Sequence, residues 1–134
     1  MTVRTATCKL IRPGESYVGQ QGFTYIGGLT GASAGARGLC MTVLPLPDGA
    51  RARTHLHRGI ETAAYILEGV VDMYYGERLE HFIQACAGEY VYVPADMPHL
   101  VLNRSGAPAR AVVAHSAGDD QDGIVLLPEL DGLV

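Results

Sequence analysis

The chain has 134 residues, of which 48% are hydrophobic and 18% are charged, and its formal net charge at pH 7 is −4. At this length we expect one domain, spanning residues 1–134, with a core large enough to be stable without disulfide or metal staples. No apolar run approaches the roughly 20 residues that cross a bilayer, which argues against a membrane protein. No basic stripe is present to follow a phosphate backbone, which argues against a nucleic-acid partner.

Glycines and prolines divide the chain into short segments that are rich in Val, Ile, Tyr, Leu and Thr. Such segments, separated by turn residues, are typical of strands. The expected strands, in chain order, are Cys8–Arg12, Phe23–Ile26, Leu39–Leu44, Arg53–His57, Ala63–Leu67, Val70–Tyr75, His81–Gln84, Tyr90–Val93, His99–Asn103, Arg110–His115 and Ile124–Leu127. No segment keeps a helical period over three turns, so the pattern favours an all-β sandwich or barrel.

The glycine-rich segment Gly27–Gly38 interrupts this series of strands. It contains Gly31, Ser33 and Gly35 in the G-x-S-x-G spacing of a hydrolase nucleophile. That motif requires a buried strand before the serine and a helix after it, whereas here the flanks are further glycines and then another strand. We therefore interpret the segment as a surface loop, which can act as a flap over a cavity.

The cysteines and the beginning of the chain indicate a cytoplasmic protein. Cys8, Cys40 and Cys86 are an odd number without a CxxC pair, which is usual in a reducing compartment. All three have small or apolar neighbours, and we interpret them as core residues. The first ten residues lack the apolar segment of a secretory signal peptide.

Three of the five histidines lie in a pattern that is typical of a metal site. His55 and His57 are two residues apart, so that on a strand both imidazoles project from the same face. Glu61 follows shortly afterwards, and His99 follows a rigid turn that contains two prolines. Two or three neutral imidazoles with one carboxylate bind Fe, Mn, Ni, Co or Zn and leave positions open for water or substrate. The pattern predicts a mononuclear metal site formed by these four residues.

The spacing of these residues resembles two motifs of the cupin superfamily. The first motif, G-x5-H-x-H-x3,4-E-x6-G, is matched by Gly49, His55, His57, Glu61 and Gly69. The second motif, G-x5-P-x-G-x2-H-x3-N, is matched by Gly88, Pro94, Asp96, His99 and Asn103. The motifs occupy residues 49–69 and 88–103. The resemblance implies a jelly-roll β-barrel, also called a double-stranded β-helix, which holds one metal ion inside through His55, His57, Glu61 and His99.

The chain departs from these motifs at two positions. Asp96 stands where the family has glycine, and aspartate tolerates a positive φ better than most residues, so we expect the turn to form. Seven residues rather than six separate Glu61 from Gly69, so that the family spacing counted back from Gly69 reaches Thr62. A slip of one residue can turn the carboxylate away from the metal, although a bulge at residues 58–60 would restore it. We expect Glu61 to be a ligand, with a three-histidine site as the alternative.

Two classes of function remain open from the sequence. The resemblance implies a metal-dependent enzyme acting on a small oxygenated substrate, with an oxidoreductase of the dioxygenase type favoured over an isomerase, lyase or cyclase. Fe(II) is the favoured ion, with Zn, Ni, Mn or Co as alternatives. Glu61 is the expected catalytic group, and a pocket tyrosine or a metal-bound hydroxide are its alternatives. The second class is a non-catalytic module that binds a small molecule or a metal.

Other residues carry weaker expectations. One of Tyr90 and Tyr92 is expected to point into the barrel, and Val101 is expected to line the cavity beside His99. We interpret His115, at the end of an apolar strand, as a core histidine, with a supporting role beside the metal ligands as the alternative.

We also expect a homodimer. The segment Cys8–Arg12 is interpreted as an edge strand, and an exposed edge invites pairing with another subunit. The apolar tail Ile124–Pro128 would likewise be covered by a partner.

Overall fold

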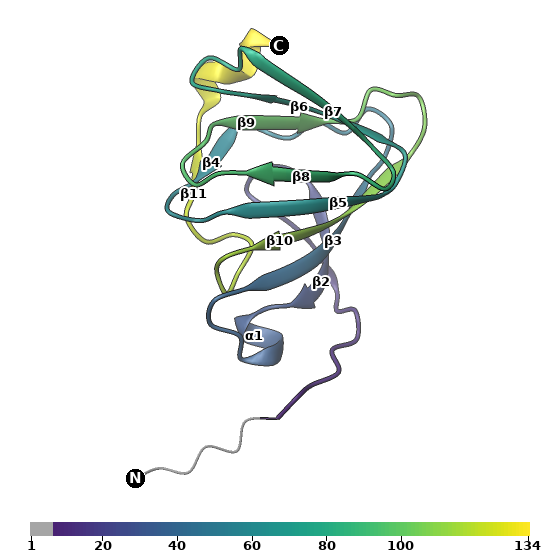
Figure 1. Ribbon diagram of the computed structural model, residues 1–134, viewed down its shortest axis with the longest axis vertical. Coiled ribbons are helices and arrows are strands. Elements are labelled where there is room, and N and C mark those ends of the chain that lie inside the picture. Colours follow the sequence, from purple (N-terminus) through teal and green to yellow (C-terminus); the bar gives the residue numbers. More distant parts are fainter. Residues whose placement is uncertain (1–6) are drawn as a thin grey trace.

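The computed structural model describes residues 7–134, which form two antiparallel sheets (Figure 1). The six-stranded sheet has the order β1-β2-β3-β10-β5-β8, with bounds Ser16–Val18, Thr24–Leu29, Cys40–Leu46, Ala109–His115, Thr62–Glu68 and Tyr90–Val93. The five-stranded sheet has the order β11-β4-β9-β6-β7, with bounds Ile124–Leu126, His55–His57, His99–Leu102, Val70–Tyr75 and His81–Cys86. This architecture confirms the all-β prediction.

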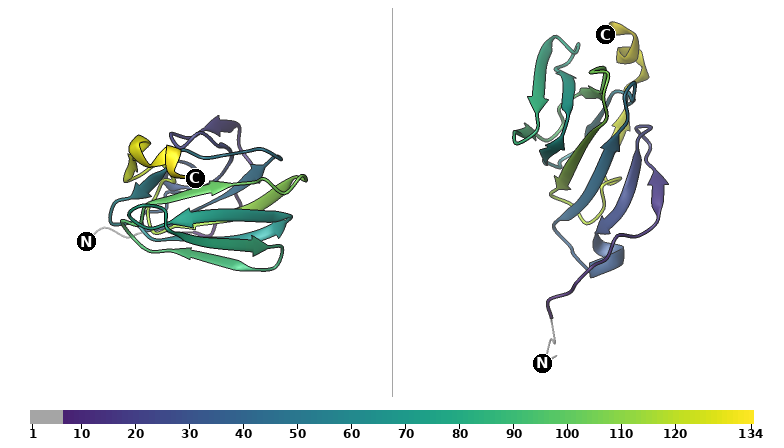
Figure 2. Two further views of the ribbon diagram at one scale, coloured as in Figure 1. Left: turned by 90° about the horizontal axis from the view of Figure 1, so that it is seen from above. Right: turned by 90° about the vertical axis from the view of Figure 1, so that its right-hand side faces the viewer.

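Two short helices complete the described part of the chain. The α-helix α1 spans Gly31–Ala34, and the 3-10 helix η1 spans Pro128–Leu133. They lie at opposite ends of the molecule (Figures 1 and 2). Neither is long and apolar enough to cross a membrane.

The first predicted strand is wrong, because Cys8–Arg12 pairs with no strand in the structure. Pro13 follows this segment and has no N–H to donate to a ladder. Pairing with β2 begins after it, where the Gly14 N–H donates to the Gly27 carbonyl at 2.9 Å. The paired strand is β1, which the sequence analysis did not identify.

The glycine-rich segment is more ordered than the predicted loop. β2 continues to Leu29, and Thr30 then caps α1 by accepting a hydrogen bond from the Ser33 N–H. The Ser33 hydroxyl donates to the Gly28 carbonyl at 2.7 Å, so this side chain stabilises the cap. No residue of the segment lines the cavity of the barrel, which gives neither a flap nor a nucleophile there.

The cysteine prediction is right for one residue and wrong for two. Cys40 is buried, whereas Cys8 and Cys86 are exposed. On β7 the inward positions belong to Ile83 and Ala85, so alternation turns Cys86 outward.

The main core lies between the two sheets. β3 and β10 lie side by side in the six-stranded sheet, and each buries every second residue, as expected for strands with one face toward a core. A second cluster, formed by Leu79, Leu100, Leu102 and Leu130, lies on the other side of the five-stranded sheet, where η1 packs against it. The inward face of that sheet, with His99 and Val101 of β9, lines the cavity.

Strand β8 corrects the expectation that one of its tyrosines points inward. Val91 and Val93 line the cavity, whereas Tyr90 and Tyr92 are both exposed. Val101 on β9 lines the cavity as predicted.

The turn before β9 adopts the conformation that the second motif requires. Asp96 has a φ of 65°, in the left-handed region where the family has glycine, which confirms that aspartate supports this turn. Its N–H donates to the His57 carbonyl at 3.0 Å, and its carboxylate accepts from the Gly59 N–H at 2.9 Å. Asp96 therefore ties the turn that leads to His99 to the end of β4.

We predict that Asp96→Val lowers the free energy of unfolding by about 2–3 kcal/mol. A β-branched residue resists the left-handed region, and the hydrogen bond to Gly59 is lost. Asp96→Asn is the matched control, since asparagine retains both properties and should stay within about 1 kcal/mol of the wild type. Chemical denaturation measures both differences, and equal stability of the valine variant would contradict this account of the turn.

Candidate metal site

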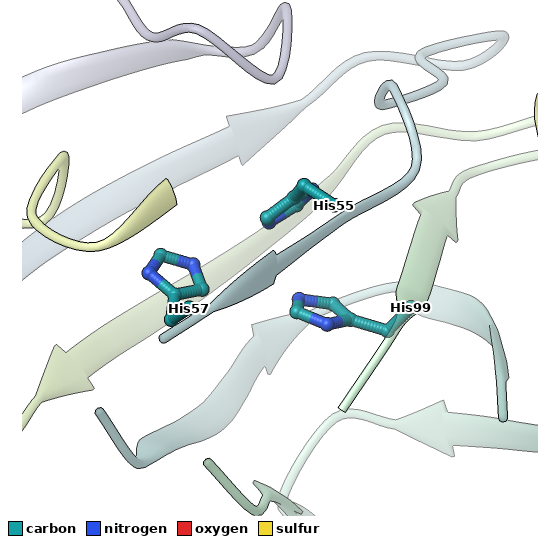
Figure 3. Close-up of side chains that lie close together, drawn as sticks. All are labelled: His55, His57 and His99. Carbon is teal, nitrogen blue, oxygen red and sulfur yellow. The ribbon is translucent and has the colours of Figure 1, made fainter. Parts of the chain in front are cut away.

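Strands β4 and β9 bring His55, His57 and His99 together inside the barrel (Figure 3). His55 and His57 point inward because they are alternate residues of β4. His99 begins β9 and lies directly opposite His55 in the sheet register. One side-chain nitrogen of each histidine lies within 4.8 Å of the other two, and each residue is only 4% exposed.

Backbone carbonyl groups orient these imidazole rings. Nδ1 of His55 and Nδ1 of His99 each lie 2.8 Å from the carbonyl oxygen of the residue two positions earlier. Because a carbonyl oxygen only accepts, Nδ1 carries the proton in both rings and Nε2 keeps its lone pair. Nδ1 of His57 makes a longer contact of 3.4 Å with the Asp122 carbonyl oxygen. This arrangement prepares Nε2 as the ligand atom.

Burial keeps the three imidazoles neutral. Desolvation lowers the pKa of His55 well below its usual value, and the neighbouring His99 lowers it further. Desolvation also lowers the pKa of His57, and it lowers the pKa of His99 to about 4. Metal ions bind imidazole in its neutral form, so at neutral pH these ligands need not lose a proton. The donor set therefore fits a divalent metal ion.

The structure places Glu61 apart from the three histidines. Its side chain is exposed, and its carboxylate accepts a hydrogen bond from the Tyr92 hydroxyl. The next residue, Thr62, begins β5 and is buried with its side chain in the cavity wall. Because side chains alternate along a strand, the extra residue between Glu61 and Gly69 puts the threonine inside and the carboxylate outside. The structure thus assembles the three-histidine alternative, and a carboxylate ligand at this position is not part of it.

A fourth histidine faces the same cavity. His115 ends β10, is buried, and stacks on His57 with ring centroids 4.6 Å apart. Its Nδ1 lies 2.8 Å from the Thr62 hydroxyl oxygen. Burial lowers the pKa of His115 to about 3, with further contributions from the charges of His57 and His99. The strand alternation of β10 was visible in the sequence, but the pairing that brings His115 to the cavity was not.

The cavity beside the histidines is small and mostly apolar. Its volume is about 80 Å³. Space of this size holds several water molecules or one small organic molecule. Besides the imidazoles, its wall includes Gln21, Tyr25 and Thr62. The Gln21 side-chain amide donates to the Tyr25 hydroxyl at 2.5 Å. Alongside Thr62 and His115, these residues form a second hydrogen-bonded pair in the wall.

A family model described as the cupin domain matches residues 42–115, which include all four buried histidines. The chain belongs to the cupin family. No curated protein matches it.

Solved cupin structures share its architecture. A protein from Thermus thermophilus is 28% identical, with a TM-score of 0.55 over 61% of this chain and 75% of that chain. An uncharacterized protein with a double-stranded beta-helix domain from Klebsiella pneumoniae is 16% identical, with a TM-score of 0.62 over 87% and 89%. Oxalate oxidase in complex with glycolate is 20% identical, with a TM-score of 0.64 over 75% and 53%. This cupin therefore spans about half the length of the oxalate oxidase, and the shared fold confirms the jelly-roll prediction.

We predict that the metal-free cupin loses stability as the pH falls from about 6.5 to about 4. In this range histidines of the unfolded chain take up protons, whereas the buried ones stay neutral because their pKa values are lowered. The unfolded state then binds more protons, so the free energy of unfolding rises with pH by up to about 1.4 kcal/mol per unit for each such histidine.

Denaturation curves between these pH values measure the slope. His115→Gln should reduce it, because one buried histidine is removed. His81→Gln is the control, since His81 is exposed on β7, and it should leave the slope unchanged. A slope that is insensitive to His115→Gln would contradict the assignment.

Proposed function

We propose that this cupin is a metal-dependent enzyme that acts on a small oxygenated organic molecule. Its ion would be held by His55, His57 and His99. The observation that carries the proposal is the meeting of these three neutral imidazoles in a buried cavity, where the Nδ1 protons of His55 and His99 are directed to backbone carbonyls just before β4 and β9. Three protein ligands leave coordination positions open, as in catalytic rather than structural metal sites. Fe(II) is the ion that we favour, with Zn, Ni, Mn or Co as alternatives, because imidazole suits several of these metals.

When bound, the ion would supply Lewis-acid polarisation of a substrate oxygen and, if it is redox-active, chemistry with dioxygen. The residues of the chain have three roles in this proposal. The histidines hold the ion, and the apolar wall around Met73 and Val101 limits the water near it. The amide of Gln21 and the hydroxyl of Tyr25 offer polar contacts in a wall that is otherwise mostly apolar. A reaction of the dioxygenase type is favoured, with isomerase, lyase or cyclase activity as alternatives.

The size of the cavity supports a substrate of few non-hydrogen atoms. Its volume of about 80 Å³ lies well below the roughly 300–1,000 Å³ of pockets for drug-sized ligands. Glycolate in the oxalate oxidase complex is a molecule of this size class. Small hydroxy acids, dicarboxylic acids and diketones, which chelate a metal through oxygen, are therefore the first candidates.

A non-catalytic module that binds a small molecule or a metal is the second candidate. The observation in its favour is that, among residues 7–134, histidines are the sole acidic or basic side chains that line the cavity. A general acid or base would then have to be a histidine, Tyr25 or water on the ion.

We predict that the protein binds one divalent ion per chain and that His99→Gln weakens this binding at least about tenfold, since one of three ligands is lost. Glu61→Gln is the matched control. Because Glu61 is exposed and apart from the histidines, its loss should change the affinity by less than about threefold. Calorimetric titration with Co(II) and Zn(II) measures both affinities. An equal loss in the two variants would place the carboxylate in the site and contradict the three-histidine assignment.

An assay of turnover separates the two candidate functions. Fe(II)-loaded protein should consume oxygen or convert a small chelating substrate from a panel of glycolate, oxalate, a catechol and a 1,2-diketone. His55→Gln should abolish this conversion, because it removes a ligand. Saturable binding of one of these molecules without conversion, under Fe(II), Mn(II), Ni(II), Co(II) and Zn(II) in turn, would favour the non-catalytic module.

A further inference from the structure

The three-histidine site leaves one buried histidine of the cavity unused. His55, His57 and His99 come from the five-stranded sheet, whereas His115 comes from β10 of the six-stranded sheet. His115 thus approaches the cavity from the opposite wall, where it stacks on His57.

His115 does not have the position of a fourth ligand. It lies outside the group whose nitrogens are all within 4.8 Å of one another. His115 therefore lies beside the three converging nitrogens without joining them.

Thr62 contacts the ring of His115 at Nδ1. The two residues are directly opposite each other on β5 and β10, and the Thr62 hydroxyl oxygen lies 2.8 Å from Nδ1. Among residues 7–134 no hydrogen bond is made by Nε2, and the residue lines the cavity. Nε2 is therefore available to a ligand or a water molecule in the cavity.

We propose that Nε2 of His115 hydrogen-bonds a small anion or oxygen ligand that is coordinated to the ion, and that Thr62 is the residue that positions the ring. This inference rests on the proposed metal site. In this arrangement the ligand is contacted from both sheets. The ion would bind it from the side of β4 and β9, and His115 would contact it from the side of β10. The hydroxyl of Thr62 can donate to Nδ1 or accept from it, so Nε2 can serve as acceptor or donor.

The test uses azide as the probe and Co(II)-loaded protein, whose visible spectrum reports both the ligand set and the bound anion. We expect His115→Phe to leave the Co(II) affinity within about threefold of the wild type, and the visible spectrum without azide unchanged, because His115 is not a ligand. The same variant should raise the azide Kd about tenfold, through loss of one hydrogen bond to a charged group. Thr62→Val should raise the azide Kd about threefold, and Thr62→Ser should restore it.

Each outcome decides a separate claim. Loss of Co(II) binding or a changed spectrum in His115→Phe would make the histidine a ligand and overturn the inference. An azide Kd that is unchanged in both His115→Phe and Thr62→Val would reduce the residue to packing, as would absence of azide binding by the wild-type Co(II) protein. Absence of Co(II) binding by the wild type would instead refute the proposed metal site. Should His115→Phe fail to fold, the Thr62→Val and Thr62→Ser pair decides alone.

A separate observation concerns the outer face of the six-stranded sheet. Alternation turns two cross-strand rows of uncharged side chains outward on β3, β10, β5 and β8. We call these rows the outer apolar face, and its residues are Met41, Ala114, Ala63 and Tyr92 in one row and Val43, Val112, Tyr65 and Tyr90 in the other. A sheet with one face in water normally carries polar residues there. The outer apolar face departs from that pattern.

The outer face of the five-stranded sheet, in contrast, is partly covered and carries charged residues. There η1 covers part of the sheet by packing Leu130 against Leu100 and Leu102. Elsewhere on that face Arg104 pairs with Asp72 at 2.8 Å. The outer apolar face has no such cover within the described residues.

We infer that the outer apolar face pairs with the same face of a second copy of the chain. Tyr90 is 80% exposed, Tyr92 58% and Met41 51%. These three side chains alone present roughly 350 Å², and a stable interface buries about 800 Å² per partner, so the eight-residue face supplies a substantial part of what a dimer needs. A two-fold interface sets side chains of the face near those of its own copy, and the two rows themselves carry no charge, while Glu61 lies beside Tyr92 at their edge.

The sequence analysis based its dimer on two other segments, and the structure supports neither of them. The segment Cys8–Arg12 forms no edge strand, and Ile124–Leu126 is already paired with β4 as β11. Neither segment is therefore available in the way that was expected.

Sedimentation velocity at micromolar concentrations tests the interface. The wild type should sediment with twice the 14.2 kDa mass of the chain, and Tyr90→Glu should weaken the association at least about tenfold. Phe82→Glu is the matched control, because Phe82 is 48% exposed on β7 of the other sheet, and this variant should remain dimeric. Circular dichroism verifies that both variants are folded. A monomeric wild type, or a dimer that Tyr90→Glu does not affect, would overturn the inference.

Discussion

The site depends on the burial of three neutral imidazoles next to one another. Inside the barrel a charged imidazolium is costly, and three would also repel each other, so that burial lowers the pKa of each ring. Backbone carbonyls hold the Nδ1 protons of His55 and His99, so that Nε2 of each ring keeps its lone pair. These lone pairs could bind a divalent ion. The candidate site is thus tied to the fold, because β4 and β9, neighbours in the five-stranded sheet, carry all three histidines.

Strand alternation explains why much of this site was visible in the sequence. His55 and His57 are two residues apart, which places both on one face of any strand. The rigid turn before His99 and the aspartate at its left-handed position were also predictable, since few residues tolerate that conformation. Periodicity and local backbone chemistry therefore identified the three histidines that converge, together with most of the strands, before any tertiary information was used.

The remaining features depend on register between strands, which the sequence does not display. Glu61 and Thr62 are neighbours, and the register of β5 decides which of the two side chains faces the cavity. His115 reaches the cavity only because β10 pairs with β5 opposite Thr62. On β8 both faces carry apolar side chains, so no polar residue marked the outside and the tyrosines were misassigned. The cavity wall beside His115 thus carries the hydroxyl of Thr62, while the carboxylate of Glu61 lies outside it.

An anomalous difference map from crystals of the protein loaded with Co(II) tests the central claim most directly. The account predicts one peak inside the barrel, about 2.1 Å from Nε2 of His55, His57 and His99, with Glu61 remote from it. A peak bound to Glu61, or a barrel without any peak at full loading, would contradict it.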